Sequence, residues 1–154
     1  MKAEKLNAGD ICTRVVVVAE RGTTVLEAAQ RMREQHVGCL VVIDPREARR
    51  VVVGLLTDRD IVTGVVAKGL DPQMLRAEDV MTEAPLTVRA SASFAEVLAA
   101  MQLRGVRRVP VVEADGSLVG LVTLDDLVEI FAGQMHGIAQ VIEAGQRHER
   151  LARR

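Results

Sequence analysis

Hydrophobic and polar positions follow one another along this chain in a pattern that occurs twice. Each copy starts with a short apolar run, continues with a stretch of helical period, passes through two more apolar runs and closes with a second helical stretch. Short runs between polar turns predict strands, and apolar positions three and four residues apart predict helices. The expected elements are strand 15–19, helix 24–35, strands 40–43 and 51–56 and helix 58–67, then strand 86–88, helix 93–104, strands 109–112 and 118–122 and helix 124–131.

The two copies align residue by residue with one change of spacing. Cys12 falls on Met81 and, further along, Gly54 falls on Gly120. The offset shortens between these points because the segment 44–53 is longer than its counterpart in the second copy. Loops absorb such insertions at little energetic cost, so the chain is an internal repeat with the order β-α-β-β-α in each copy.

The first helix of each copy opens with a capping box. Thr24 and Glu27 form the pattern T-x-x-E, and Ser93 and Glu96 form S-x-x-E, in which hydroxyl and carboxylate bind amides of the first turn. One unit of about 55 residues buries too little apolar surface to be stable alone. We therefore expect an α/β (α+β) fold of two tandem β-α-β-β-α repeats that pack sheet to sheet, followed by a C-terminal helix.

The repeats also set the expected boundaries. They are a first repeat with its N-terminal segment at 1–69, a linker at 70–78, a second repeat at 79–133 and a helical tail at 134–154. Gly69 and Gly133 stand where the second helix of each copy is expected to stop. The tail has Ile138, Val141 and Ile142 on one side, and Arg147, Arg150 and Arg154 at helical spacing. This arginine face favours a solvated surface or a dimer contact over binding of nucleic acid.

Composition argues against nucleic acid and membranes as partners. Phe94 and Phe131 are the only aromatic residues, so nucleic-acid bases would find few rings to stack on. A formal net charge of -1 gives no strong field toward polyanions. The chain starts without a signal-like apolar stretch, and no apolar run approaches the roughly 18 residues of a membrane span.

The cysteines and histidines carry no signature of a metal or redox site. Cys12 and Cys39 form no C-x-x-C motif, and nothing else indicates secretion, so a reduced, cytoplasmic protein is the simplest interpretation. The three histidines are scattered without metal-ligand spacing, so no metal site is expected.

The motif G-h-h-T-x-x-D, in which h is apolar, occurs in both copies at the passage from strand to helix. It contains Thr57 and Asp60 in the first copy and Thr123 and Asp126 in the second. Amides at a helix start bind phosphate, a threonine hydroxyl can donate to phosphate, and a carboxylate can accept from both hydroxyls of a ribose. The same pair is also a plain N-cap with an acid at the third position. Both interpretations stay open at this stage.

Arg107 and Arg108 precede the strand 109–112 of the second copy. Two guanidinium groups at a strand entrance can clamp phosphate, although a solvated turn also carries such residues. Gly38 and Cys39 occupy the matching positions of the first copy, so the two halves differ in chemistry. No nucleophile or histidine accompanies the aspartates, so we expect neither an enzyme nor a catalytic cofactor.

These motifs resemble the CBS (cystathionine-beta-synthase) domain pair, also called a Bateman module. The resemblance covers about residues 10–132 and rests on DICT (10–13), VGCLVVID (37–44) and GLLTDRDI (54–61), repeated as DVMT (79–82), RRVPVV (107–112) and DGSLVGLVTLDDL (115–127). It implies two repeats about a pseudo-twofold axis with two related clefts. It also implies an adenosine ligand such as AMP, ADP, ATP or S-adenosylmethionine, and a homodimer.

The resemblance also implies which residues contact the ligand. Thr57, Asp60, Thr123 and Asp126 would contact phosphate and ribose, and Thr24 and Ser93 would lie near the base. Six residues before the inner strands would line the pockets, namely Val37, Gly38, Cys39, Val106, Arg107 and Arg108. One departure is that the first copy has Val41 where the second has Pro110, and it lacks basic residues before that strand.

We therefore expect a cytoplasmic regulator that senses an adenine nucleotide and acts on an unknown effector protein. No effector domain is expected within these 154 residues, so the regulation would act on another chain. The alternatives are a stress-associated interaction scaffold whose clefts stay empty and a sensor of another adenosyl ligand such as S-adenosylmethionine.

Overall fold

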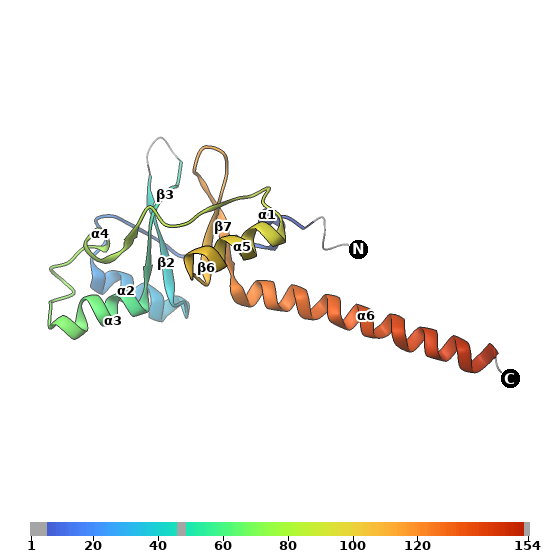
Figure 1. The fold of residues 1–154 in the computed structure, drawn as a ribbon. Coiled ribbons are helices and arrows are strands. Elements are labelled where there is room, and N and C mark those ends of the chain that lie inside the picture. Colours follow the sequence, from blue (N-terminus) through green and yellow to red (C-terminus); the bar gives the residue numbers. More distant parts are fainter. Residues whose placement is uncertain (1–5, 46–48, 153–154) are drawn as a thin grey trace.

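The computed structural model describes residues 6–45 and 49–152, so part of the loop 44–53 and Arg154 of the arginine face lie outside the described residues. The first repeat contains β1 (Val18–Glu20), α2 (Val25–Gln35), β2 (Cys39–Asp44), β3 (Val51–Thr57), α3 (Asp58–Gly64) and the 3-10 helix η3 (Val66–Lys68). The second contains β5 (Val88–Arg89), α5 (Phe94–Arg104), β6 (Arg108–Val112), β7 (Leu118–Thr123) and α6 (Leu124–Ala152). The short elements α1 (Ala8–Ile11), α4 (Ala77–Val80) and β4 (Thr82–Glu83) precede the two repeats along the chain or join them (Figure 1).

Each repeat builds its own sheet, and the expected order β-α-β-β-α is confirmed. In the first repeat β1 runs parallel to β2, and β2 runs antiparallel to β3. Strands β5, β6 and β7 repeat this arrangement. The register pairs Cys39 with Thr57 and Arg108 with Thr123. In both repeats, therefore, the start of the inner strand lies beside the threonine of the T-x-x-D motif.

The two expected capping boxes are present. The Thr24 hydroxyl accepts a hydrogen bond from the Glu27 amide at 3.1 Å, and the Glu27 carboxylate accepts one from the Thr24 amide at 3.1 Å. Ser93 and Glu96 form the same pair of bonds at 3.3 and 2.7 Å. Hydrogen bonds from the Ser93 amide and hydroxyl hold the pKa of Glu96 below its ordinary value.

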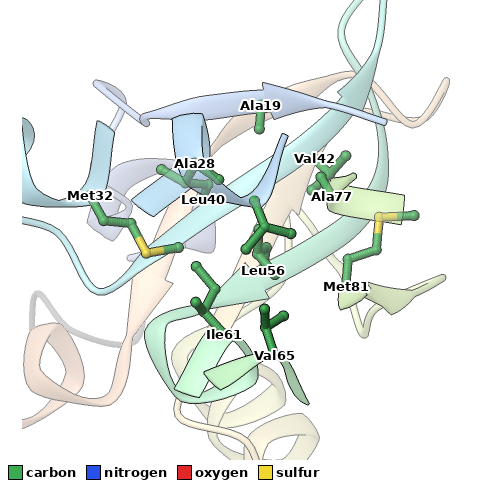
Figure 2. Packing of buried hydrophobic residues seen from close by; sticks show 11 residues of the cluster. Ala19, Ala28, Met32, Leu40, Val42, Leu56, Ile61, Val65, Ala77 and Met81 are labelled. Atoms are coloured by element: carbon green, nitrogen blue, oxygen red, sulfur yellow. The ribbon is translucent and has the colours of Figure 1, made fainter. Parts of the chain in front are cut away.

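Each repeat has an aliphatic core, and a third cluster joins the two sheets. Leu40, Leu56 and Ile61 are buried in the first core, which Figure 2 shows. Between the sheets, Val41 and Ile43 of β2 pack with Leu118 of β7. The sheet-to-sheet packing expected from the small size of each repeat is therefore confirmed.

Two short segments pack against the repeat that they do not adjoin in the sequence. The N-terminal segment packs on the second repeat, and the segment that leads into the second repeat packs on the first. Ala8 of α1 is buried in the core of the second repeat, whereas Ala77 and Met81 are buried in the core of the first. Thr13 pairs with Leu121 of β7, and β4 pairs with β3. These related crossings give the pair its pseudo-twofold character.

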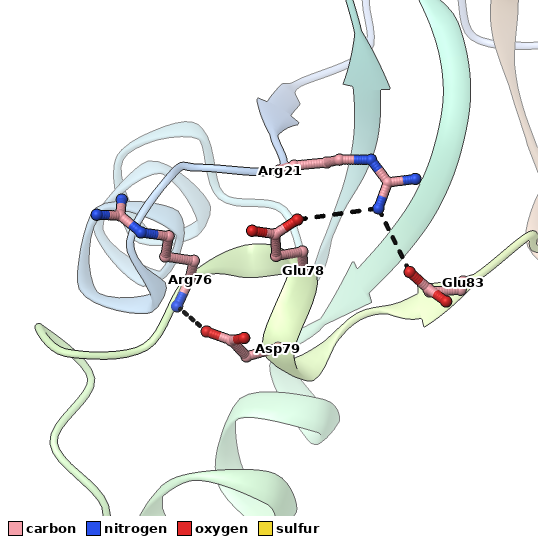
Figure 3. A network of polar contacts seen from close by, with 5 residues as sticks. All are labelled: Arg21, Arg76, Glu78, Asp79 and Glu83. Carbon is pink, nitrogen blue, oxygen red and sulfur yellow. Dashed lines mark hydrogen bonds and ion pairs between the residues drawn. The ribbon is translucent and has the colours of Figure 1, made fainter.

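Polar contacts fix the crossing that joins the repeats (Figure 3). The Arg21 guanidinium lies 4.0 Å from the Glu78 carboxylate and 3.3 Å from that of Glu83. The Asp79 carboxylate accepts a hydrogen bond from the Arg76 amide at 2.8 Å, which caps α4. The second half of the expected linker is thus a structured part of the first repeat's surface.

The C-terminal helix differs from the expectation. We expected a helix that stops near Gly133 and a separate tail helix, but α6 continues without interruption from Leu124 to Ala152. A glycine inside a helix costs about 1 kcal/mol relative to alanine, which does not by itself end a helix. Gly69, by contrast, does end η3, with a left-handed φ of 66°.

Two further expected boundaries were wrong. The apolar run 15–19 forms a strand only from Val18, although the Val17 carbonyl already accepts a hydrogen bond from the Val41 amide at 3.2 Å. The helix expected at 58–67 ends at Gly64 and is followed by η3.

Candidate functional site

A cleft of about 440 Å³ opens where the end of β3 meets the entrance of β6, and we call it the first cleft. Its lining includes the T-x-x-D motif of the first repeat and residues 106–108 of the second repeat. Charged residues of the lining are Asp58, Arg59, Asp60, Arg107 and Arg108. The first cleft therefore spans both repeats and has three guanidinium groups against two carboxylates.

Asp60 forms a capping box with Thr57 that uses only one of its two carboxylate oxygens. Its Oδ2 atom accepts hydrogen bonds from the Thr57 amide at 2.8 Å and from the Thr57 hydroxyl at 2.7 Å. The Asp60 amide donates to the same hydroxyl at 3.2 Å. Within the described residues, both hydrogen bonds that the Asp60 carboxylate accepts end on Oδ2, so Oδ1 is left to accept hydrogen bonds from a ligand. Capping and ligand binding, which the sequence presented as alternatives, are compatible in this geometry.

The second repeat reproduces this geometry at Thr123 and Asp126. Asp126 Oδ2 accepts from the Thr123 amide at 2.7 Å and from its hydroxyl at 2.8 Å. Thr123 lines a smaller cleft of about 220 Å³, which we call the second cleft. Its opposite side is formed by residues 37–39 of the first repeat. Each motif thus faces the strand entrance of the other repeat.

Arg108 is shared between the two clefts, because its side chain lines both. A Cβ atom on Gly38 would lie 3.5 Å from the Arg108 guanidinium and 3.1 Å from the Asp58 carboxylate. The Asp58 carboxylate would be crowded by a side chain at Gly38, whereas the Arg108 guanidinium lies at ordinary contact distance from this position of the other repeat. The second cleft obtains from the second repeat the cation that its own strand entrance lacks.

Cys39 lines the second cleft and is buried. Burial raises the pKa of its thiol, although the Arg108 guanidinium opposes this effect and the carboxylates of Asp58 and Asp60 add to it. A thiol with a raised pKa stays protonated at neutral pH and is a weak nucleophile. Cys39 therefore acts as a small apolar wall residue.

The structure separates the candidate residues into two groups. Thr57, Asp60, Val106, Arg107 and Arg108 line the first cleft, and Val37, Gly38, Cys39 and Thr123 line the second. Asp126 is held against Thr123. Thr24 and Ser93 lie elsewhere, since Thr24 pairs with Arg76 and Ser93 pairs with Asn7, and neither residue lines these two clefts.

Several lining residues were not among the sequence candidates. The first cleft includes Leu55, Arg59, Thr82, Pro85, Leu86 and Gly105, and the second includes Thr13, Leu121 and residues 15–17. Thr13 and Thr82 carried a signal, because they occupy matching positions in the two copies of D-x-x-T. Arg59 carried none, since its counterpart Asp125 has the opposite charge.

The described residues form neither a metal cluster nor a membrane-spanning helix. Across residues 6–45 and 49–152, no three or more His, Cys, Asp or Glu side chains are grouped so as to hold a metal ion. In the same part of the chain, no helix combines the length and apolar character needed to cross a membrane.

Two tandem β-α-β-β-α units with clefts between them define a paired α/β module, and comparison with known proteins gives its family. The family model described as CBS domain matches residues 8–67 and 77–133. The chain belongs to the CBS domain family and contains two copies of the domain.

Individual relatives agree with this assignment. Hypoxic response protein 1 of Mycobacterium tuberculosis is 36% identical over 137 residues, which cover 89% of this chain and 92% of that protein. A crystal structure of Hypoxic Response Protein I with two coordinated zinc ions has a TM-score of 0.70 and 38% identity, over 80% of this chain and 97% of that one. The crystal structure of CBSX2 in complex with AMP has a TM-score of 0.72 and 27% identity, over 84% of this chain and 98% of that one.

A longer relative is found in an archaeon. The uncharacterized protein MK0525 of Methanopyrus kandleri is 30% identical over 125 residues, which cover 81% of this chain. The chain spans about 62% of the length of that protein.

Proposed function

We propose that the protein is a regulator that binds an adenine nucleotide, AMP, ADP or ATP, in the first cleft. The observation that carries this proposal is that Asp60 of the first repeat and Arg107 and Arg108 of the second line the same cleft. A carboxylate oxygen outside the capping box suits the two hydroxyls of a ribose, and guanidinium groups suit phosphate. The apolar part of the lining, at Leu55, Pro85 and Leu86, suits a purine ring.

The volumes of the two clefts support the first cleft as the nucleotide site. Sites for small molecules typically measure about 300–1,000 Å³. The first cleft, at about 440 Å³, falls in this range, whereas the second, at about 220 Å³, falls below it. That CBSX2, which shares this fold, was crystallised with AMP supports the choice of an adenine nucleotide.

The regulatory mechanism that we propose is a shift between relative orientations of the two repeats. The first cleft takes its carboxylate from one repeat and its arginines from the other, so a bound nucleotide bridges them. A ligand that contacts both repeats stabilises the orientation in which both sets of contacts form. An effector protein that binds this orientation more tightly would then respond to the nucleotide.

Other parts of the proposal concern where the protein acts and in what form. We propose a cytoplasmic homodimer that acts on an effector protein and does not catalyse a reaction. The few aromatic residues and the net charge of -1 favour a protein over a nucleic acid as the partner, and neither cleft contains, among the described residues, a nucleophile–histidine pair for catalysis.

Calorimetric titration of the protein with AMP, ADP, ATP, adenosine, S-adenosylmethionine and GTP tests the nucleotide proposal. We expect the adenine nucleotides to bind more tightly than adenosine, because only they offer phosphate to the arginines. Equal affinity for GTP would remove the specificity for adenine. If no ligand of this set binds at millimolar concentration, the scaffold function with empty clefts replaces the proposal.

A further inference from the structure

The helix α6 extends well beyond the second repeat. Leu127 is buried in the core of that repeat, but every residue from Phe131 to Ala152 is exposed, and Figure 1 shows the helix projecting from the body. At about 1.5 Å per residue, the 29 residues of α6 reach roughly 43 Å. Most of this length therefore has no packing partner within the described chain.

A helix of this composition needs a partner to stay folded. Isolated helices are marginally stable in water, and helices in proteins gain most of their stability from packing an apolar face. Gly133, Gly137 and Gly145 lower the stability further, by about 1 kcal/mol each relative to alanine. A Cβ atom on any of them would meet nothing within 4 Å, so no contact in this chain explains these glycines.

The exposed apolar residues of α6 follow a seven-residue repeat. They are Val128, Phe131, Met135, Ile138 and Ile142, each between 52% and 58% exposed. Their alternating spacing of three and four residues is the pattern of a and d positions in a coiled coil. The neighbouring e and g positions of this stretch carry no charge, namely Ala132, Gln134, Ala139, Val141 and Gln146. The stripe is therefore built to face another helix, and its charged residues point away from it.

The charges at the two ends of α6 identify the partner. Residues 124–131 contain three acids and no base, a net charge of -3. Residues 147–152, which end the described helix, contain two arginines and one glutamate, a net charge of +1. Two copies of α6 in antiparallel orientation place the acidic end of each beside the basic end of the other, whereas parallel copies place like charges together.

We propose that α6 pairs with α6 of a second copy of this chain as an antiparallel coiled coil. The apolar layers are self-complementary in this orientation, because Met135 faces Ile138, Phe131 faces Ile142 and Val128 faces Gly145 of the other helix. Because Gly145 has no side chain, the two helices can approach closely where it faces Val128. This interface rests on the homodimer of the proposed function and specifies where it forms. It does not depend on nucleotide binding.

Light scattering on nucleotide-free protein at micromolar concentration tests the pairing. We expect a particle of about twice the 16.7 kDa chain mass. Ile138→Glu should halve the mass of the wild-type particle and lower the helical circular dichroism. Ala144→Glu is the matched control, because it adds the same charge to the same exposed helix on the side away from the stripe, and it should leave both values unchanged. A wild-type monomer, or an unchanged mass for Ile138→Glu, would overturn the interface.

Cross-linking tests the orientation and does not rely on a destabilised variant. Mixed oxidation of Phe131→Cys with Ile142→Cys should give a disulfide-linked heterodimer, and neither variant should cross-link to itself. Self-linked Phe131→Cys would indicate parallel helices and overturn the proposal, while wild-type protein controls for Cys12 and Cys39. Titration of Ile138→Glu with AMP then separates the two proposals, because the first cleft contains no residue of α6. If the nucleotide proposal is wrong, AMP binding is absent while the dimer still forms; if the interface is wrong, the mass and cross-linking results fail while AMP still binds.

Discussion

The carbonyl oxygen of Thr13 lies 2.7 Å from the point that a Cβ atom on Gly120 would occupy, and the sulfur of Cys12 lies 2.5 Å from it. Two backbone hydrogen bonds between Thr13 and Leu121, of 2.9 and 3.0 Å, hold the chains at this separation. The glycine of the second G-h-h-T-x-x-D motif is therefore required by the crossing of the N-terminal segment. In the first repeat, Met81 crosses over Gly54 in the same way.

We expect Gly120→Ala to lower the free energy of unfolding by about 1–3 kcal/mol, the usual range for overpacking. Gly54→Ala should have a smaller effect, since its Cβ would meet the side chain of Met81, which can shift, and not backbone. Urea unfolding of both variants measures the difference.

Gly133→Ala serves as the comparison for these variants, because its Cβ would meet nothing within 4 Å. It should leave the protein as stable as wild type or stabilise it by up to about 1 kcal/mol, through helix propensity alone. Equal losses at Gly120 and Gly133 would show that the crossing does not explain the glycine.

The sequence predicted the element order and the helix caps because both are local properties. Thr24 with Glu27 and Ser93 with Glu96 form hydrogen bonds within one helical turn. Each of these local patterns also occurs in both copies of the repeat. It did not reveal which core a short segment joins. Ala8 lies in the second core although it precedes the first repeat, and this depends on long-range packing that periodicity does not encode.

The candidate site shows the same division between local and long-range information. The Thr57–Asp60 box could be predicted, because the two residues lie within one turn. The shared position of Arg108 could not, since it depends on how the two repeats pack against each other. The uninterrupted α6 was missed because a glycine inside a helix and a glycine at its end look alike in sequence.

Arg108→Ala should weaken binding of AMP or ATP by about 1.5–3 kcal/mol, the scale of a hydrogen bond to a charged group. Binding of adenosine should change much less, because adenosine has no phosphate. Arg104→Ala is a suitable control, since it removes the same charge from an exposed position on α5. Equal calorimetric curves for wild type and the Arg107/Arg108 double alanine variant would contradict the phosphate role.

The two thiols should make the stability of the protein fall at alkaline pH. Burial raises the pKa of both Cys39 and Cys12, so the unfolded chain releases these protons at lower pH than the folded chain. The contribution is fully present below the ordinary thiol pKa of about 8.5 and is lost as pH rises through the folded values. The chain has no tyrosine to add to this titration.

Unfolding midpoints in reducing buffer, from neutral to alkaline pH, test this expectation. The double variant Cys12→Ala/Cys39→Ala should show a flatter decline than wild type, whatever its stability at neutral pH. The same slope in both proteins would assign the alkaline loss to other groups.

Asp60→Asn separates the proposed ligand contact from the helix cap, since the cap uses Oδ2 and leaves Oδ1 for the ligand. The amide keeps the size of the side chain and one acceptor, so without ligand the stability should fall by no more than about 1 kcal/mol. A ribose diol needs an acceptor for both hydroxyls, and the amide replaces one acceptor with a donor. Affinity for AMP should therefore fall about tenfold or more, on the order of 1.4 kcal/mol. The increase in unfolding temperature given by saturating AMP should decrease with it, because ligand stabilisation follows the ratio of ligand concentration to dissociation constant.

Asp126→Asn is the matched variant, since its capping box has the same geometry beside the smaller cleft. Because the first cleft is the proposed nucleotide site, Asp126→Asn should change AMP affinity less than Asp60→Asn does. If Asp60→Asn binds AMP as tightly as wild type, Asp60 is only a cap, and if Asp126→Asn alone loses affinity, the nucleotide occupies the second cleft.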